Sequence, residues 1–485
     1  MNKKNFFRTL LPFFFLTLFV ATSCSNEEVI DETAHSVATT NLAFAVKMPK
    51  GVMMGSSAAS TRYDSGNYNH VGDYEGVDMT SRIDLYLVSA DGKSLLESRR
   101  FDYTELTWLY DENGMQVVQP KDPILTTAGD KIAIVTVNSP YPLMNYAPSA
   151  TDLVSITSEF PLTAIGQFVD YEEQRVLRVM MSGCSEVTTI VDGVTSDEVK
   201  TGVNRIQLSV DRMPSRVIVT QSPDLIANSS DLGTFSDITY GSAQGAKSMY
   251  LLPHIEDGVY KTYGYDYVAG DDYLRTSAGY YCYEYLQDIN RAVPVNPSTA
   301  SDPQAYLGIE GLLFLENTHA NYQKGNTTYV MIRAKFTPKA EAIKDGGALA
   351  ADGTFYVGGT DGNIYSSMAA AVDPATGVSG QNVATYVGGK TLYYVWLNPD
   401  NVQSPTVSPV IRNNIYHINI NSFKQLGVNW NPLTPDVNNP DPQPEGGNEP
   451  DNPIKPEDPL SSVETYMSVD IEVKNWTVHS YDVDL

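Results

Sequence analysis

The stretch Asn41-Leu42-Ala43-Phe44-Ala45-Val46-Lys47-Met48-Pro49 carries an apolar side chain at every second position. Because side chains alternate between the two faces of an extended strand, this spacing predicts a β-strand with one apolar face. The four residues on that face are Leu42, Phe44, Val46 and Met48. Residues 50–61 are rich in Gly, Ser, Ala and Met without periodicity, which predicts an exposed loop that separates the strand from the rest of the chain.

Short strand-like segments continue from Arg82 to about residue 430, with Gly, Asn and Asp turn signals between them. The clearest are 83–88, 131–137, 201–210, 216–221, 328–336, 353–357, 391–397 and 415–420, whereas only 280–292 and 366–372 have helical periodicity. This pattern predicts a mainly β fold of two antiparallel β-sandwich domains. We place the junction at Met213-Pro214, which gives domains at 63–213 and 214–430.

The first 24 residues are typical of an export signal. Lys3, Lys4 and Arg8 precede an apolar run that is too short to span a bilayer, and the run ends at Cys24. Small residues before Cys24 resemble a bacterial lipobox, so residues 1–24 are predicted to be a lipoprotein signal peptide with Cys24 as the lipidation site. The alternative is an ordinary signal peptide cleaved nearby. Residues 25–62 would then be a propeptide, and acyl chains on Cys24 would hold the precursor on the outer membrane.

The C-terminal end of the chain has two parts. Residues 431–462 hold nine prolines and are predicted to form an acidic, semi-rigid linker. Residues 463–485 return to strand-like alternation, with a change of register around Asn475 that suggests a bulge. The apolar positions of this second isolated strand are Met467, Val469, Ile471 and Val473.

Two isolated strands with the same spacing, one near each end, point to strand exchange. A sheet that lacks one strand exposes unpaired N–H and C=O groups and apolar pockets, and another chain can fill the gap. Four buried apolar side chains at about 1.5–3 kcal/mol each would supply about 6–12 kcal/mol. If a cut after Arg62 removes the first strand, the C-terminal strand of a neighbouring copy can replace it, and repeated head-to-tail contacts give a filament. The simpler alternative is that both strands pair within their own chain.

Composition excludes other classes of function. A formal net charge of -26 excludes nucleic-acid binding as the main activity. The six histidines have no metal-ligand spacing, and no catalytic or phosphate-binding motif is present, so we expect no enzyme, cofactor or metal. The turns at Asp111-Gly114 and Asp361-Asn363 are weak calcium candidates. Cys184 and Cys282 are expected to be free buried thiols, although a disulfide between them stays possible.

Several segments resemble one family in the same order along the chain. They are Arg62-Asp78, Met180-Gly183, Val210-Val217, Glu316-Thr318, Tyr393-Leu397, Arg412-Ile420 and Asp482-Leu485. Together they are similar to the type V pilus fimbrillins of Bacteroidales, and most similar to the shaft subunit of short fimbriae. The resemblance implies two transthyretin-like β-sandwiches and lipoprotein export. It also implies a cut between Arg62 and Tyr63 by an arginine-specific protease, and polymerisation through residues 467–473 as the donor strand.

Copies of the chain itself, accessory anchor and tip subunits, and that protease are therefore the implied partners. The mature subunit would lie in a cell-surface fimbrium that supports adhesion and biofilm formation. The competing hypothesis is a tip-located or non-polymerising surface adhesin, or a glycan-binding lipoprotein. A tip subunit would need the acceptor groove but no donor strand, so the intact 467–473 pattern favours the shaft.

Overall fold

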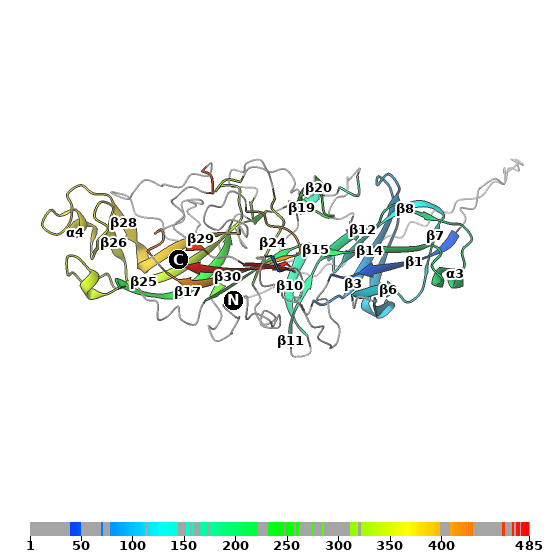
Figure 1. Cartoon of the computed structure of the whole chain (residues 1–485), viewed down its shortest axis with the longest axis horizontal. Helices are drawn as coiled ribbons and strands as arrows, with labels where there is room; N and C mark the ends of the chain where they lie inside the picture. Colours follow the sequence, from blue (N-terminus) through cyan, green and yellow to red (C-terminus); the bar gives the residue numbers. More distant parts are fainter. Residues whose placement is uncertain are drawn as a thin grey trace, which may run out of the picture. The chain divides into compact units, whose positions relative to one another are not determined.

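The computed structural model describes residues 39–49 and, with short gaps, 78–260, 311–397 and 408–429. It also describes 69–70, 273–274, 284–285, 458–460, 468–469, 472–475 and 477–484. The chain from Thr39 to Leu485 forms one compact unit, and β-strands dominate it (Figure 1). The predicted mainly β fold is therefore confirmed. Cys24, Arg62 and Tyr63 lie outside the described residues.

Up to residue 213, the described residues form the strands β1 to β15 and two short helices; all of these belong to the N-terminal part except β2, which joins a sheet of the C-terminal part. The strands are β1 (Thr39–Lys47), β2 (Asn69–His70), β3 (Arg82–Ser89), β4 (Leu95–Asp102), β5 (Leu106–Tyr110), β6 (Gln116–Pro120), β7 (Ile124–Thr127), β8 (Gly129–Val137), β9 (Thr157–Glu159), β10 (Gly166–Tyr171), β11 (Gln174–Val179), β12 (Met181–Cys184), β13 (Thr188–Ile190), β14 (Arg205–Ser209) and β15 (Asp211–Arg212). The helices are the 3-10 turn η1 (Tyr103–Glu105) and α3 (Ser196–Lys200).

The C-terminal part begins at β16. Its strands are β16 (Ser215–Gln221), β17 (Gly233–Ala243), β18 (Gly245–Ala246), β19 (Ser248–Tyr250), β20 (Ile255–Glu256), β21 (Val259–Tyr260), β22 (Tyr273–Leu274), β23 (Glu284–Tyr285), β24 (Leu312–Phe314), β25 (Tyr329–Pro338), β26 (Phe355–Gly358), β27 (Ile364–Tyr365), β28 (Val383–Tyr386), β29 (Lys390–Trp396), β30 (Asn414–Ser422), β31 (Ser468–Val469), β32 (Glu472–Asn475) and β33 (Thr477–Asp484). The helices are η4 (Ala340–Ala342), α4 (Met368–Val372) and η5 (Val387–Gly389).

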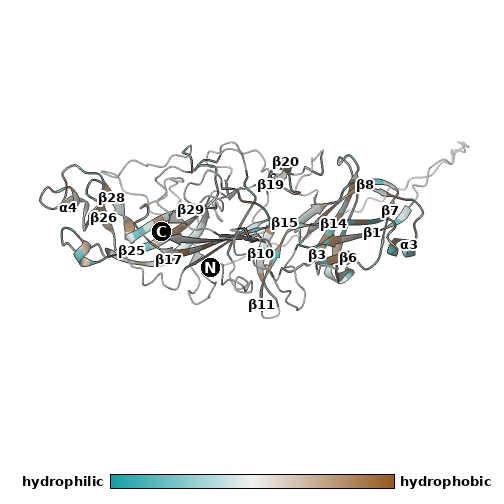
Figure 2. Cartoon of the chain, viewed as in Figure 1, coloured by the Kyte–Doolittle hydropathy of each residue, from teal (hydrophilic) through white to brown (hydrophobic). Residues whose placement is uncertain are grey.

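Two sheets of the N-terminal part share one hydrophobic core, which we call the first core. One sheet has the order β14-β1-β6-β5, with β7 also pairing β1, and the other has the order β15-β12-β8-β3-β4, with β13 on β8. Both sheets contribute alternate residues, such as Phe44, Leu85 and Val135, to this core. Figure 2 shows that these strands are hydrophobic where the flanking loops are polar.

A second core lies between sheets of the C-terminal part. The sheet β2-β32-β33-β30-β16-β24 and the sheet β23-β17-β25-β29 contribute to it, among others through Val219, Ile332 and Ile418. The strand pair β9–β19 and a third cluster around Met180 and Leu251 connect the two parts. A division into two sandwich domains at residue 213 therefore stays a prediction.

The structure corrects several details of the sequence analysis. Most ladders are antiparallel as predicted, but β1 with β14, β2 with β32, β16 with β30 and β30 with β33 are parallel. The helix predicted at 366–372 is confirmed by α4, whereas Glu284–Tyr285 within the predicted helix 280–292 is strand β23. Cys184 is free and exposed rather than buried, and Cys282 lies outside the described residues.

The C-terminal segment pairs with its own chain. β33 adds in parallel to β30 from Asn414–Thr477 to Ser422–Asp484, and β31 and β32 fold back antiparallel onto β33. Asn475 stands opposite Thr477, so the chain reverses there, and the predicted bulge around Asn475 is wrong. The end of the Pro-rich linker is also attached, because Pro459 pairs with Gln323 and Leu460 is 1% exposed.

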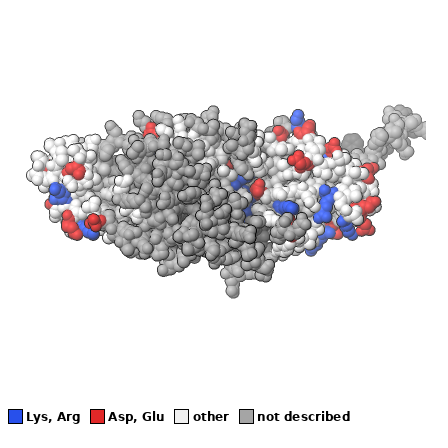
Figure 3. All heavy atoms as spheres, in the orientation of Figure 1, with Lys and Arg blue, Asp and Glu red and all other residues white. Residues whose placement is uncertain are grey.

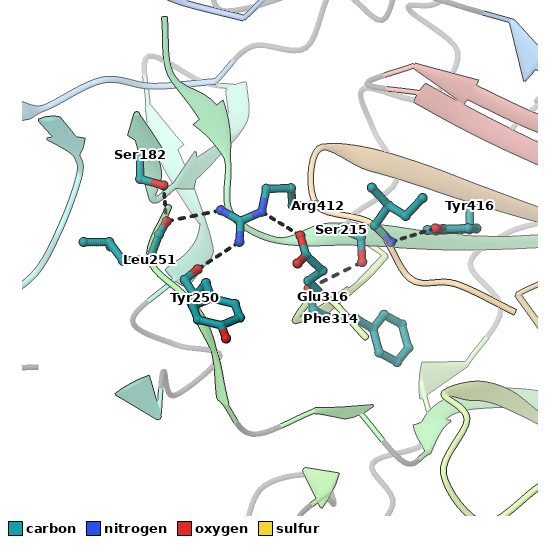
Figure 4. Close-up of polar contacts among 9 residues, drawn as sticks. Ser182, Ser215, Tyr250, Leu251, Phe314, Glu316, Arg412 and Tyr416 are labelled. Carbon is teal, nitrogen blue, oxygen red and sulfur yellow. Dashed lines mark hydrogen bonds and ion pairs between the residues drawn. The ribbon is translucent and has the colours of Figure 1, made fainter. Parts of the chain in front are cut away.

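Two buried ion pairs, one in each part, lie where the two parts meet, and Arg212 Nη1 donates to Asn413 Oδ1 across the boundary at 3.2 Å; we call this place the junction network. Arg212 pairs with Asp78, and both side chains are 1% exposed. Arg412 Nε donates to Glu316 Oε2 at 2.6 Å, and its other nitrogens donate to the carbonyl oxygens of Tyr250 and Leu251 (Figure 4). Burial raises the pKa of Asp78 even though the Arg212 guanidinium lowers it.

On the face seen in Figure 3, by contrast, exposed basic and acidic side chains are interspersed.

Candidate functional site: the slot around the first strand

The four apolar side chains predicted for the first strand all point into the first core. Leu42 and Val46 are 0% exposed, and Phe44 and Met48 are 1% exposed. The Phe44 ring packs against Phe101 of β4, with 5.5 Å between ring centroids. The predicted alternation of this strand is therefore confirmed, while its removal by proteolysis stays a prediction.

Strand β1 lies inside its sheet and not at an edge. On one side β14 pairs in parallel with Ala43–Lys47. On the other side β7 pairs antiparallel with Thr39–Leu42, and β6 pairs with Val46 and Lys47. Without β1, a slot would remain between β14 and the β6–β7 wall, with unpaired backbone groups on both sides and an apolar floor.

Side chains and backbone groups fix both ends of β1. At its beginning, Asn204 Nδ2 donates to Thr40 Oγ1 at 3.1 Å and to the Asn41 carbonyl oxygen at 3.0 Å. Asn204 has a φ of 48°, a left-handed conformation that asparagine tolerates well. At its end, Met48 N donates to the Gln116 carbonyl oxygen at 2.9 Å, and Lys47 Nζ lies 3.0 Å from Asp111 Oδ2. The walls of the slot therefore hold both ends of β1.

A pocket opens beside the middle of β1. The turn between β6 and β7 leaves Ala43 and Phe44 without a ladder partner on that side, and both residues line the pocket. Arg205, Lys121 and Lys200 also line it, together with the acidic Asp122. Helix α3, which contributes Lys200, has a capping box in which Thr195 hydrogen bonds hold the pKa of Glu198 below its ordinary value.

The predicted removable strand, β1, lies in a sheet of the N-terminal part, whereas the described residues of the predicted donor strand lie in a sheet of the C-terminal part. Met467 and Ile471 lie outside the described residues, whereas Val469 and Val473 belong to the backbone of β31 and β32. Sequence reasoning missed the walls of the slot. The run 201–210 predicted a strand, but nothing in it shows that this strand is the neighbour of β1.

Other candidate residues have structural roles. Asp361 accepts hydrogen bonds from Asn363 and Tyr365 within one turn, and His417 is a buried residue of strand β30. Of the Asp111-Gly114 turn, 112–114 lie outside the described residues. Among the residues that the structure describes, no group of His, Cys, Asp or Glu side chains has the arrangement of a metal site. No helix among the residues that the structure describes has the length and apolar character needed to cross a membrane.

Comparison with known proteins gives strong matches to fimbrial subunits. Residues 384–482 match the family model "Major fimbrial subunit protein type IV, Fimbrillin, C-terminal". Over 491 residues the chain is 30% identical to the Minor fimbrium subunit Mfa1 of Porphyromonas gingivalis, which covers 93% of this chain and 93% of that protein.

Solved structures show more distant likenesses. A fimbrilin (fimA) from Porphyromonas gingivalis W83 has a TM-score of 0.37 and 16% identity, over 84% of this chain and 95% of that chain. The tip fimbrial protein Mfa3 from Porphyromonas gingivalis, with a C-terminal truncation, has a TM-score of 0.33 and 9% identity, over 78% and 93%. Evidence of family membership therefore comes from the sequence match.

Proposed function

Because the chain belongs to the fimbrillin family of Bacteroidales fimbrial subunits, we propose that it is a shaft subunit that polymerises by exchange of its first strand. Fimbrillins are structural proteins, so the chain is not an enzyme. In the proposed exchange, β1 leaves the slot after proteolysis, and residues 467–473 of a neighbouring copy take its place.

The observation that carries this proposal is the position of β1. A segment upstream of the proposed cut supplies an interior strand and four buried side chains of the first core. A propeptide that had only to be discarded would not need to be built into a core. Loss of β1 would remove buried apolar contacts that contribute about 6–12 kcal/mol to stability. A strand of matching spacing from another copy would restore these contacts.

The donor segment must reach a neighbour that lies close. Leu460 is buried on the C-terminal part, so only residues 461–466 separate this anchored point from Met467. Six extended residues span about 20 Å, which is less than the full Pro-rich linker would allow. The exchange therefore requires end-to-end contact between subunits. It also requires β31 and β32 to leave β33, on which they lie in the uncut chain.

Export and maturation complete the proposal. Cys24 would carry the lipid that holds the precursor on the outer membrane, and an arginine-specific protease would cut between Arg62 and Tyr63. The released subunit would assemble with copies of itself on the cell surface, with anchor and tip subunits at the two ends of the filament.

One observation favours the second candidate function, a tip-located or non-polymerising adhesin. β33 is paired with β30 of the same chain, so the C-terminal segment of the uncut protein already has a partner. If this pairing persists after the cut, the segment is not free to act as a donor.

Limited cleavage of the purified precursor separates the two candidates. We expect trypsin-like cleavage after Arg62 to produce filaments that electron microscopy detects. A variant that lacks Val463–Leu485 should be cut equally well and stay monomeric. If this truncated variant also forms filaments, or if the cut full-length protein stays monomeric, the shaft proposal is wrong.

A further inference from the structure

The face of β1 opposite to the first core carries small side chains next to a charged residue of β14, and an incoming strand would meet this charge. Ala43 and Ala45 are small, and Arg205 of β14 is the ladder partner of Ala43. The Arg205 guanidinium reaches across β1 and donates from Nη2 to Gln119 Oε1 of β6 at 3.1 Å. Its Nε is buried and has no hydrogen-bond partner among the described residues. Arg205 therefore links the two walls of the slot across position 43.

The middle of the slot and its end at Lys47 carry opposite charge. Near Ala43, the pocket is lined by Arg205, Lys121 and Lys200 against the single acid Asp122. Lys121 Nζ donates to the Thr104 carbonyl oxygen and Lys200 Nζ to Asp197, so the buried Nε of Arg205 is the open donor of this group. Near Lys47, the charged residue of the wall is Asp111.

The proposed donor strand has an acidic outer face. Between its apolar positions stand Ser468, Asp470 and Glu472, whereas β1 has Ala43, Ala45 and Lys47 at the equivalent positions. We propose that Arg205 and the neighbouring lysines recognise the acidic outer face of residues 467–473 of a second copy, which lies in the slot with its direction opposite to that of β1. This inference rests on the proposed strand exchange.

The direction follows from the charges. If the four apolar residues of the donor fill the four apolar sites in the opposite direction, Glu472 replaces Ala43 beside Arg205, and Ser468 replaces Lys47 beside Asp111. In the same direction as β1, Glu472 would stand beside Asp111, and like charges directly opposite each other are unfavourable. Asp470 replaces Ala45 in both cases. Because Ala45 is 1% exposed, this carboxylate would be buried and would need the Arg205 guanidinium, which stands diagonal to it within reach of a long side chain.

Assembly kinetics of the cut protein test the recognition. Opposite charges accelerate association, so D470N/E472Q should slow assembly about tenfold at low salt and make its rate less salt-dependent. R205E should slow it similarly, and R205E combined with E472R should restore the rate. The matched control is Lys344→Glu, an exposed charge reversal outside the slot, which should leave the rate unchanged.

The outcomes separate this inference from the proposed exchange. Unfolding midpoints of the uncut R205E and R205M precursors show whether R205E still folds, and R205M repeats the test without a new charge. If charge variants assemble at the wild-type rate while Ile471→Asp abolishes assembly, the recognition is wrong and the exchange stands. If wild-type cut protein never assembles, the exchange itself is wrong.

Disulfide trapping tests the direction. Leu125 of β7 is exposed and is the ladder partner of Asn41. In a background with Cys184 and Cys282 replaced by serine, Leu125→Cys should form an intermolecular disulfide with Lys474→Cys and none with Tyr466→Cys. The reverse result would show that the donor runs in the same direction as β1 and would overturn the inferred direction.

Discussion

At the scale of single residues, Phe44 is the largest of the four β1 side chains that are buried in the first core. It is 1% exposed and packs against Phe101. Truncation of a buried phenylalanine to alanine leaves a cavity, so Phe44→Ala should destabilise the uncut precursor by about 3–5 kcal/mol. Denaturant unfolding measures this loss, with Lys47→Ala as a partly exposed control on the same strand. A loss below about 1 kcal/mol would show that the core does not depend on β1.

The Asp78–Arg212 ion pair of the junction network gives a second prediction at the scale of single residues. Asp78→Ala leaves the buried Arg212 without its carboxylate, which should cost about 3–5 kcal/mol, because an unpaired buried charge is strongly unfavourable. The double variant Asp78→Leu/Arg212→Met removes both charges and should be more stable than Asp78→Ala. The free energies of unfolding of the wild type, the Asp78→Ala variant and the double variant, measured under one set of conditions, test this expectation. A double variant that is less stable than Asp78→Ala would show that the ion pair itself stabilises the fold.

Residue patterns predicted β1 well and the junction network poorly. The spacing of Leu42, Phe44, Val46 and Met48 alone shows which face of the strand is apolar, because the alternation of side chains is a local property. Arg212, Glu316 and Arg412 lie in segments that carried the family resemblance, but charged residues are rarely fully buried. Nothing local indicates that charged residues 96 and 134 positions apart neutralise one another in the interior.

At the scale of elements, the parallel partner of β1 was the feature that sequence reasoning missed. β14 follows β1 by about 160 residues, and long-range strand pairing is not contained in either strand's own pattern. The C-terminal hairpin was missed for a similar reason. Alternation predicts strands in 467–485, but whether the chain continues or reverses at Asn475 depends on the strand that it meets, which is β30.

A disulfide that holds β1 in its slot tests the role of this element. Asn41 and Leu125 are antiparallel ladder partners, and the Cβ atoms of such pairs lie close enough for a bridge after small adjustments. In the background without Cys184 and Cys282, N41C/L125C should be cut normally after Arg62 yet fail to assemble until a reductant is added. Filament formation by the oxidised protein, measured by light scattering, would show that assembly does not need the slot.

At the scale of the whole molecule, one peptide bond is expected to control assembly. Arg62→Gln removes the proposed cleavage site without altering a described contact. We expect cells with this variant to accumulate the full-length lipoprotein and to lack fimbriae, because β1 keeps the slot filled. Immunoblots of membrane fractions and electron microscopy of the cell surface measure both effects, with Lys344→Gln as a control that removes an exposed basic charge outside the slot. Normal fimbriae in the Arg62→Gln cells would exclude cleavage at this bond as the trigger.

The occupant of the slot in an assembled filament tests the account most directly. A cryo-electron microscopy map of isolated fimbriae, at a resolution that shows side chains, identifies the strand that lies between β14 and the β6–β7 wall. We predict residues 467–473 of the neighbouring subunit there, and no density for residues 39–48. A map in which residues 39–48 of the same chain still occupy the slot would contradict strand exchange.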